Sequence, residues 1–329
     1  MANKENFAVI VNEEACRDLI SAGDAFAAVQ GVFSAMAAGK AKNFPVVREP
    51  IGYADALYGF KSGFDEQTMT LGVKAGGYWP QNLTTLSMTN HQSTVLLFDP
   101  DTGRLRAVVG GNHLTALRTA AATAVSIAHL SRPQSKILGI MGAGHQSEFQ
   151  VRAAVETREF TTLLGWNRSA EGLVKLREVA ADCGLSFSAV SPDEMASSAD
   201  VIITITSSHN SLLIADKVRP GLHIAAMGTD TKGKQELDAN IMTVASVFTD
   251  AVEQSITIGE AQHAVSAKLI SREAITPIGD VINAVHHGRR DDAEITVFDG
   301  TGVGLQDLAL AQVAVERALK AGKAVFAPL

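Results

Sequence analysis

The stretch Ile137-Leu-Gly-Ile-Met-Gly-Ala-Gly-His-Gln-Ser147 determines how the rest of the chain is interpreted. An apolar run breaks into Gly142-x-Gly144-x-x-Ser147, and a segment compatible with a helix follows. In such a unit the first glycine permits a sharp strand-to-helix turn, the second lets the backbone approach a pyrophosphate, and the N–H groups that begin the helix bind the anion. Ser147 stands where a third glycine or alanine is usual, and it is small enough for close helix–strand packing. We predict a dinucleotide site here, with a purely structural turn as the alternative.

The residues after Arg132-Pro133 alternate between strand and helix patterns. The predicted strands are 136–141, 161–166, 200–206, 222–227, 247–249 and 294–298, and the predicted helices are 146–158 and 170–183. This alternation is typical of a doubly wound parallel sheet, that is, of a Rossmann domain. We place that domain at residues 131–304, in a chain of the α/β class.

The remaining residues predict a second, β-rich domain. Residues 23–40 have apolar side chains at helical spacing and predict a core helix. Residues 44–110 alternate short apolar runs with turn signals, which is typical of antiparallel strands joined by hairpins. Residues 114–130 form an alanine- and threonine-rich helix before the boundary. An apolar stripe beyond Gly304 predicts a helix that returns to the first domain, so this domain comprises residues 1–130 and 305–329.

Composition limits the classes of partner. The 329 residues are 46% hydrophobic and 19% charged, which suits about two globular domains. The net charge is −7 and the basic residues are scattered, so we expect no nucleic-acid or membrane partner and a small-molecule substrate instead. Cys16 and Cys183 lack metal-ligand spacing and are interpreted as buried, reduced thiols. The N-terminal residues lack a signal-peptide pattern and no apolar run reaches ~18 residues, which favours a cytoplasmic protein.

Several motifs, in this order along nearly the whole chain, carry a family resemblance. They are Lys74-Ala-Gly-Gly-Tyr-Trp-Pro-Gln-Asn82, Phe98-Asp-Pro-Asp-Thr-Gly103, Thr115-Ala-Leu-Arg-Thr-Ala-Ala121, Gly142-Ala-Gly-His-Gln146, Gly228-Thr-Asp230, Gly233-Lys234, Glu236-Leu237 and Asp299-Gly-Thr-Gly302. The chain resembles the ornithine cyclodeaminase/mu-crystallin family. Segments 43–48, 55–61, 74–80 and 227–237 are most similar to the iminosuccinate reductases within it.

The resemblance implies a homodimer in which the first domain binds substrate and pairs with its mate, beside a Rossmann domain that holds NAD(P). It implies reduction of a small α-imino acid, with iminosuccinate to L-aspartate the favoured reaction. The alternatives are an ornithine cyclodeaminase-like deaminase, another reductase of the ketimine or alanine dehydrogenase type, and a mu-crystallin-like protein that only binds a small ligand.

Four cationic residues are candidates for binding the substrate. The resemblance places Arg48, Lys74 and Arg118 where the family grips the α-carboxylate and the cofactor, and a guanidinium suits a carboxylate because of its planar fork. Taken singly, each is typical of a solvated surface charge. Arg118 is the most informative, since it lies in an otherwise small and uncharged helix where an unpaired charge is costly to bury. Lys61, between two nearby glycines, is our candidate for a second carboxylate, with a lysine protecting a hairpin edge as the alternative.

Asp230 and Lys74 are the predicted catalytic residues. Asp230 follows the apolar run 222–227, so it lies where open α/β sheets bind ligands, and the resemblance gives it an acid–base role toward the imine nitrogen. The alternative for Asp230 is an N-cap of a helix that contains Glu236.

The predicted cofactor-binding residues combine the glycine turn with positions that the resemblance implies. They are Asn90, His91, Arg118, Gly142, Gly144, His145, Gln146, Asn167, Arg168, Thr206, Ser207, Gly228, Asp230 and Gly300. Asn167-Arg168 follows a predicted strand without the acidic residue that usually holds the NAD ribose, which favours NADP. The resemblance favours NAD, and we predict NAD with NADP as the alternative.

Two other kinds of site are not expected. Asp250, Glu253, Glu260 and His263 match no metal-ligand spacing and are interpreted as solvated helix faces, so no metal is predicted. The chain has no Gly-x-Ser-x-Gly elbow after a strand, which argues against a serine hydrolase.

Overall fold

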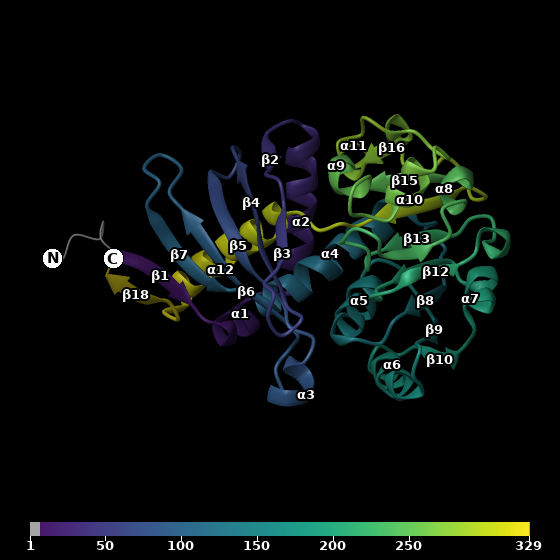
Figure 1. Cartoon of the computed structure of the whole chain (residues 1–329), viewed down its shortest axis with the longest axis horizontal. Coiled ribbons are helices and arrows are strands. Elements are labelled where there is room, and N and C mark those ends of the chain that lie inside the picture. The colour runs from purple at the N-terminus through teal and green to yellow at the C-terminus, as the bar shows by residue number, and fades with distance from the viewer. Residues whose placement is uncertain (1–6, 329) are drawn as a thin grey trace. The chain divides into compact units, whose positions relative to one another are not determined.

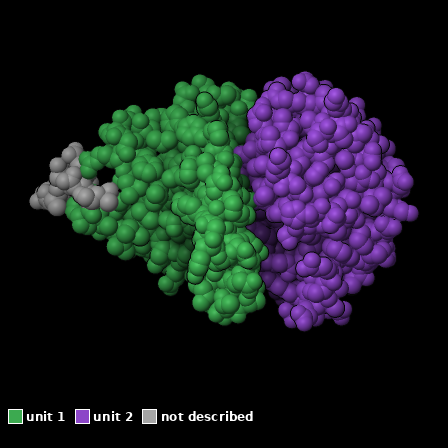
Figure 2. All heavy atoms as spheres, in the orientation of Figure 1, with its two compact units in different colours: residues 1–118, 303–329 green, residues 119–302 purple. Residues whose placement is uncertain are grey.

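The computed structural model describes residues 7–328 and divides into two compact units (Figure 2). Unit 1 comprises the residues up to Arg118 and from Val303 onward, and unit 2 comprises Thr119–Gly302. We placed the first boundary after residue 130, whereas the chain passes between the units within the helix α4 (Asn112–Leu130). The second boundary lies just before α12 (Gly304–Ala321).

Unit 1 is built on an eight-stranded sheet in the order β18-β1-β7-β6-β5-β4-β2, with β3 also paired to β4. Its strands are β1 (Phe7–Val11), β2 (Ala41–Asn43), β3 (Val47–Pro50), β4 (Leu57–Asp65), β5 (Thr70–Tyr78), β6 (His91–Phe98), β7 (Leu105–Gly110) and β18 (Val325–Pro328). From β3 to β7 all neighbours are antiparallel, which confirms the hairpins predicted for residues 44–110. Strands β1 and β7 pair in parallel.

Helix α12 packs against one face of this sheet, so the predicted return of the chain is confirmed (Figure 1). Two sheet glycines make this contact close, because a Cβ at Gly63 or at Gly72 would come within 2.9 Å of Leu305 or Leu308 respectively. The other helices of unit 1 are α1 (Glu13–Leu19), α2 (Ala22–Ala37) and α3 (Asn82–Leu86). A capping box formed by Ser21 and Asp24 begins α2, which confirms the predicted core helix.

The two faces of the unit 1 sheet differ in burial. Side chains alternate along a strand, so Val95 and Leu97 are buried while Leu96 between them is only half-buried. The same less buried face includes Tyr58 and Phe60 of β4, which are 46% and 42% exposed. The face opposite α12 is therefore apolar and accessible within unit 1.

Unit 2 contains a second eight-stranded sheet, in the order β10-β9-β8-β11-β13-β17-β15-β16, in which every pair is parallel. Its strands are β8 (Ile137–Met141), β9 (Thr162–Trp166), β10 (Ser186–Ala189), β11 (Val201–Thr204), β13 (His223–Ala226), β15 (Ala245–Thr249), β16 (Ile275–Pro277) and β17 (Ile295–Asp299). The six predicted strands and the Rossmann class are confirmed. Strands β10 and β16 were not predicted, nor was the small parallel pair of β12 (His209–Leu213) with β14 (Gln235–Leu237).

Helices connect the strands of unit 2 (Figure 1). They are α5 (His145–Val155), α6 (Ala170–Asp182), α7 (Pro192–Ser198), α8 (Ile241–Val244), α9 (Val252–Ser255), α10 (Ala261–Ser266), α11 (Ile278–Ile282) and the short 3-10 helices η2 (Ala215–Lys217) and η3 (Arg272–Ala274). The predicted helices 146–158 and 170–183 correspond to α5 and α6. All four side chains of β11 are buried, as is typical of a parallel strand covered on both faces.

Two further expectations concern accessibility. Cys16 is buried, but Cys183 is only partly buried, so that prediction was wrong for one thiol. Among residues 7–328 no single helix is long and apolar enough to cross a membrane; α1 and α2 pass that test only as a pair bent by 95°.

Candidate functional site

The glycine turn of unit 2 has the geometry of a phosphate-binding loop. Gly142 has a φ of +107°, and a Cβ there would lie 2.6 Å from the carbonyl oxygen of Ile205, so the turn itself requires this glycine. Gly144 is the N-cap of α5, with an ordinary φ of −76°, and a Cβ would meet no atom within 4 Å. The protein therefore does not need Gly144 for its own packing. The open space beside the first turn of α5, formed by His145 and Gln146, fits the pyrophosphate of a dinucleotide.

The end of β9 supports the same loop. The amide N–H of Ala143 donates to Oδ1 of Asn167 at 3.2 Å, and Nδ2 of Asn167 donates to the carbonyl oxygen of Ser169 at 2.9 Å. Asn167 thus holds the glycine turn, while the next residue, Arg168, is exposed. Residues 166–169 contain no carboxylate. A basic residue at this point is compatible with either a ribose hydroxyl or a 2′-phosphate.

Two further loops lie at the carboxyl edge of the parallel sheet, after β11 and after β13. The carboxylate of Glu236 joins them, because its Oε1 accepts the N–H of Thr206 at 2.6 Å and its Oε2 accepts the N–H of Gly228 at 2.9 Å. A Cβ at Gly228 would lie 2.5 Å from Oε1 of Glu236, so glycine is required there. Ser207, beside Thr206, is exposed.

Asp230 lies in the loop after β13. Its Oδ1 accepts Nζ of Lys234 at 2.8 Å, and the same ammonium donates to the carbonyl oxygen of Gly228 at 3.2 Å. The side chain is 28% exposed. The loop continues into strand β14, so the N-cap alternative was wrong: Glu236 belongs to a strand and not to a helix.

Gly300 follows β17 at the same edge, and its lack of a side chain has a packing cause. A Cβ there would lie 2.4 Å from Sδ of Met227, and the N–H of Gly300 donates to the carbonyl oxygen of Ala226 at 2.9 Å. Gly300 therefore holds the ends of β13 and β17 together.

In unit 1, Asp307 of α12 is the counter-ion of two predicted substrate-binding residues. Its Oδ2 lies 2.8 Å from Nζ of Lys74, and its Oδ1 accepts Nε of Arg118 at 3.2 Å. All three side chains are buried. Arg118 also donates to Oε1 of Gln306 at 3.2 Å. Asp307 was not among the predicted site residues. Its carboxylate explains how the helix that contains Arg118 accommodates a buried charge.

Lys61 of β4 is the direct cross-strand neighbour of Lys74 of β5. Strand β4 lies between β5 on one side and β2 and β3 on the other, so the edge-lysine alternative was wrong. The glycines on either side of Lys61 allow close approach of the neighbouring strands: a Cβ would lie 1.9 Å from the carbonyl oxygen of Val47 at Gly59 and 2.8 Å from that of Lys42 at Gly63. Two lysines side by side on one face favour an anionic ligand.

Burial and neighbouring charges shift the pKa values of Lys74 and Asp307. Burial, with Arg118 and Lys61 in support and Asp307 opposing, lowers the pKa of Lys74 to about 7. Burial raises the pKa of Asp307, but Arg118 and Lys74 outweigh it and hold that pKa at about 2. The site therefore contains a carboxylate that stays ionised and a lysine that titrates near neutral pH.

Arg48 and His91 belong to the same electrostatic neighbourhood of unit 1. Burial and the charges of Lys74 and Arg118 lower the pKa of His91 to about 3, so its ring is neutral, and Arg48 contributes in the same direction. Arg48 lies in β3, opposite Gly59. Asn90 has a local role as well: its Oδ1 accepts the N–H of Leu83, which holds α3.

The acidic residues 250 and 260 are not solvated, so that interpretation was wrong. Asp250 accepts the N–H groups of Thr301 and Gly302 at 3.1 and 2.6 Å, and it is buried. Glu260 is also buried and accepts the N–H of Leu237 at 2.7 Å. Both therefore hold loops at the carboxyl edge. Within residues 7–328 no three histidine, cysteine or acidic side chains are grouped as a metal site.

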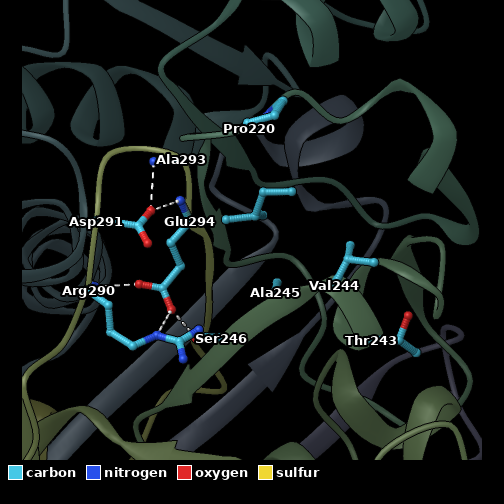
Figure 3. A pocket seen from close by; sticks show the side chains of 10 residues that line it. Pro220, Thr243, Val244, Ala245, Ser246, Arg290, Asp291, Ala293 and Glu294 are labelled. Atoms are coloured by element: carbon cyan, nitrogen blue, oxygen red, sulfur yellow. Dashed lines mark hydrogen bonds and ion pairs between the residues drawn. The ribbon is translucent and has the colours of Figure 1, made fainter.

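A hollow of about 420 Å³ lies at the opposite edge of the unit 2 sheet (Figure 3). It is lined by Ala245 and Ser246 at the start of β15 and by Ile295 at the start of β17. Glu294 in its wall is already bound by Arg290 and Ser246. Since open α/β sheets bind ligands at the carboxyl ends of their strands, this hollow is not the candidate site.

Comparison with known proteins gives concordant results. The model of the ornithine cyclodeaminase/mu-crystallin family matches residues 8–322. An iminosuccinate reductase from Paracoccus denitrificans (strain Pd 1222) is 55% identical over 316 residues, which cover 96% of this chain and 98% of that protein.

Two solved structures are similar over almost their whole length. The crystal structure of the iminosuccinate reductase of Paracoccus denitrificans in complex with NAD+ has a TM-score of 0.94 and 54% identity, covering 98% of this chain and 100% of that one. An archaeal alanine dehydrogenase dimer with bound NAD has a TM-score of 0.92 and 31% identity, covering 98% and 99% of the two chains. The chain therefore belongs to the ornithine cyclodeaminase/mu-crystallin family.

Proposed function

We propose that this protein is an imine reductase that uses a reduced nicotinamide cofactor to convert iminosuccinate to L-aspartate. The observation that carries the proposal is a group of cationic side chains in unit 1. Lys74 and Arg118 are buried and share the carboxylate of Asp307, Lys61 acts on the charge of Lys74, and Arg48 acts on His91. Guanidinium and ammonium groups gathered in this way are complementary to a small dicarboxylate. Iminosuccinate reductase is also the activity of the relative that is 55% identical.

Each group has a role that follows from its chemistry. Lys74, Arg118 and Arg48 hold the α-carboxylate, and Lys61 holds the second carboxylate. Asp230, fixed by Lys234, holds a proton at the imine nitrogen, because the iminium form accepts a hydride more readily than the neutral imine. The nicotinamide cofactor, when bound at the glycine turn of unit 2, supplies the hydride.

NAD is the proposed cofactor, and NADP remains the alternative. The related structures hold NAD, and the open space beside Gly144 fits a pyrophosphate. Arg168 after β9 would tolerate a 2′-phosphate. We also propose a cytoplasmic location, which the presence of only two cysteines, both free, supports.

The proposal is tested by following the oxidation of NADH and of NADPH with oxaloacetate, pyruvate or glyoxylate, each with ammonia. We expect oxidation to be most efficient with NADH, oxaloacetate and ammonia. Preference for the pyruvate-derived imine would contradict the iminosuccinate assignment, and preference for NADPH would contradict the cofactor assignment. Ammonia release from ornithine without net cofactor turnover would indicate a cyclodeaminase, and ligand binding without any turnover would indicate a binding protein.

The role of Lys61 is tested by the substitution Lys61→Met, which keeps the length of the side chain and removes its charge. We expect kcat/KM with the oxaloacetate-derived imine to fall roughly 100-fold, because one carboxylate is left without its partner. The value with the pyruvate-derived imine should change little. Lys42→Met, on the exposed surface of neighbouring β2, is the matched control. Equal losses with both imines would show that Lys61 is needed only for the structure of the site.

We further propose that two copies of the chain pair through the accessible face of the unit 1 sheet. That face presents Tyr58 and Phe60 to solvent, and a contiguous apolar surface of this kind is typical of an interface. The related archaeal alanine dehydrogenase is a dimer. The occupant of the face in this proposal is therefore a second copy of the chain.

A further inference from the structure

The carboxylate of Glu236 is the point at which two loops at the carboxyl edge of unit 2 meet. It is completely buried and accepts four hydrogen bonds. Oε1 accepts the N–H and the hydroxyl of Thr206, at 2.6 and 2.7 Å. Oε2 accepts the N–H of Gly228 at 2.9 Å and the hydroxyl of Thr204 at 2.7 Å. Thr204 ends β11, Thr206 lies in the loop that follows it, and Gly228 lies near the start of the loop after β13.

This arrangement requires a carboxyl group at position 236. A backbone N–H can only donate, and each oxygen of Glu236 faces one, so both oxygens must be acceptors. A glutamine of the same shape would turn its NH₂ group toward one of the two N–H groups and lose that bond. The chemistry of the contacts, and not only their number, therefore distinguishes glutamate from its amide.

A second buried carboxyl, that of Glu260, completes the junction. It accepts the N–H of Leu237 at 2.7 Å and that of Glu236 at 2.9 Å, and it contacts the hydroxyl of Thr229 at 2.5 Å. Burial and the nearby charge of Glu236 raise the pKa of Glu260 to about 8. Its partner Thr229 is a hydroxyl that can accept as well as donate, so Glu260 can carry a proton and still accept the two N–H groups.

The same contacts determine the position of Asp230. The loop that contains Asp230 begins at Gly228, which is bound to Glu236 and has no room for a Cβ: that atom would lie 2.4 Å from the carbonyl oxygen of Thr206. The loop ends at Lys234, two residues before Glu236, and Lys234 binds the carboxylate of Asp230. Both ends of the loop are thus fixed by one side chain and its immediate neighbours.

We propose that Glu236 is a positioning residue, which sets the place of Asp230 and of the loop after β11 by binding the N–H groups of Thr206 and Gly228 simultaneously. The inference rests on the proposed function insofar as Asp230 acts on an imine. It also makes a claim that is independent of turnover, namely that the two loops form a cofactor-binding surface only while both tethers are intact.

The test compares Glu236→Gln with Thr204→Val in the full-length protein. Valine has the shape of threonine, so Thr204→Val removes one hydrogen bond to Oε2 of Glu236 without changing the packing. It leaves intact the bonds from the N–H groups of Thr206 and Gly228. We expect Glu236→Gln to lower kcat roughly 100-fold, as a misplaced catalytic group does, and to weaken NADH binding measured by fluorescence titration. Thr204→Val should remain within roughly fivefold of the wild type in both.

A double-mutant cycle separates positioning from general damage. If Glu236 acts through Asp230, Glu236→Gln should reduce kcat much less in an Asp230→Asn background than in the wild type. Additive losses would overturn the proposal, and so would equal losses of activity and of melting temperature in Glu236→Gln and Thr204→Val. If Glu236→Gln does not fold, Gly228→Ala can be used instead, because its Cβ would displace the hydrogen bond between the N–H of Gly228 and Glu236. Wild-type activity in Gly228→Ala would also overturn the proposal.

Different measurements test the proposed function and the positioning role of Glu236. A wild-type protein that reduces no imine would contradict the proposed function. The NADH titrations would still test whether Glu236 positions the two loops. Unchanged NADH affinity in a folded Glu236→Gln protein would then overturn the positioning role.

Discussion

The buried ion pairs of Asp307 show how a single residue determines the electrostatics of the proposed substrate site. Without this carboxylate, Lys74 and Arg118 would be two buried cations in contact with a third, Lys61, on the adjacent strand. Leaving a buried charge without its partner typically lowers the free energy of unfolding by roughly 3–5 kcal/mol. Asp307 reduces this cost while leaving the cluster with an excess of positive charge for a ligand.

The pKa of Lys74 leads to a prediction about pH. Its value of about 7 lies below the ordinary value of 10.5, so the free protein loses the Lys74 charge as the pH rises through about 7, while Asp307, with a pKa of about 2, stays ionised. Since the charged form binds the carboxylate, kcat/KM with the dicarboxylate imine should fall by about tenfold per pH unit above that point. In Lys74→Arg, whose guanidinium stays protonated, this contribution to the pH dependence should be absent.

The measurement is the ratio of wild-type to variant kcat/KM between pH 6 and 9, because the ratio cancels the pH dependence of imine formation in solution. Arg118, Lys61 and His91 also act on Lys74 or lie beside it, and His91, with a pKa of about 3, stays neutral across this range. A constant ratio would contradict the assignment of the titration to Lys74.

The substitution Gly144→Val tests the phosphate site. A valine Cβ meets no protein atom within 4 Å, so the melting temperature should stay close to that of the wild type, but the branched side chain would fill the space of the pyrophosphate. We expect NADH binding to weaken by roughly tenfold or more, measured by fluorescence titration. Unchanged affinity in the folded variant would exclude a phosphate group beside Gly144.

Residues with local signals could be predicted from the sequence, and residues with distant partners could not. Gly142 was found because a glycine turn between a strand and a helix has a recognisable spacing. Glu236 was missed because it binds residues 8 to 32 positions away, from Gly228 to Thr204. Asp307 was missed because Arg118 is 189 positions away. Their burial also reverses the usual expectation that an acidic side chain is solvated.

At the scale of elements, the contact between α12 and the sheet depends on glycines in the strands. At Gly72 a Cβ would lie 2.5 Å from the carbonyl oxygen of Leu96 and 2.9 Å from Leu308 of α12. We expect Gly72→Ala to lower the free energy of unfolding by roughly 1–3 kcal/mol through overpacking, measured by denaturant titration.

A matched glycine gives the opposite expectation. Gly31 lies inside α2, where a Cβ meets no atom within 4 Å, so Gly31→Ala should raise the free energy of unfolding by up to roughly 1 kcal/mol. If both alanines shifted stability in the same direction, the close fit of α12 on the sheet would not be the cause of the glycine at 72.

Elements with long periodic patterns were predictable, and short ones were not. The helices at 146–158 and 170–183 and the strands of apolar residues agree with the observed elements to within a few residues. Strands β12, β14 and β16 are only three to five residues long, and β12 contains His209 and Asn210, so neither length nor polarity indicates a strand. They form because neighbouring strands supply hydrogen-bond partners that the sequence does not reveal.

At the scale of the whole molecule, the accessible face of the unit 1 sheet predicts the oligomeric state. The double substitution Tyr58→Glu with Phe60→Glu places charges on that face and should convert a dimer to a monomer in sedimentation velocity. Val174→Glu, which alters an exposed apolar residue of α6 in unit 2, is the control and should leave the dimer intact. A dimer that survives the double substitution would place the interface elsewhere.

The discontinuity of unit 1 has a consequence for how the protein is made. A ribosome adds roughly 5–20 residues per second, so synthesis of residues 119–302 separates Arg118 from α12 by roughly ten to forty seconds. Unit 2 is one continuous segment and can fold during that interval. The strands of unit 1 meanwhile lack the helix that covers their apolar face, and Lys74 and Arg118 lack Asp307. The proposed substrate site is thus among the last parts of the newborn chain to assemble.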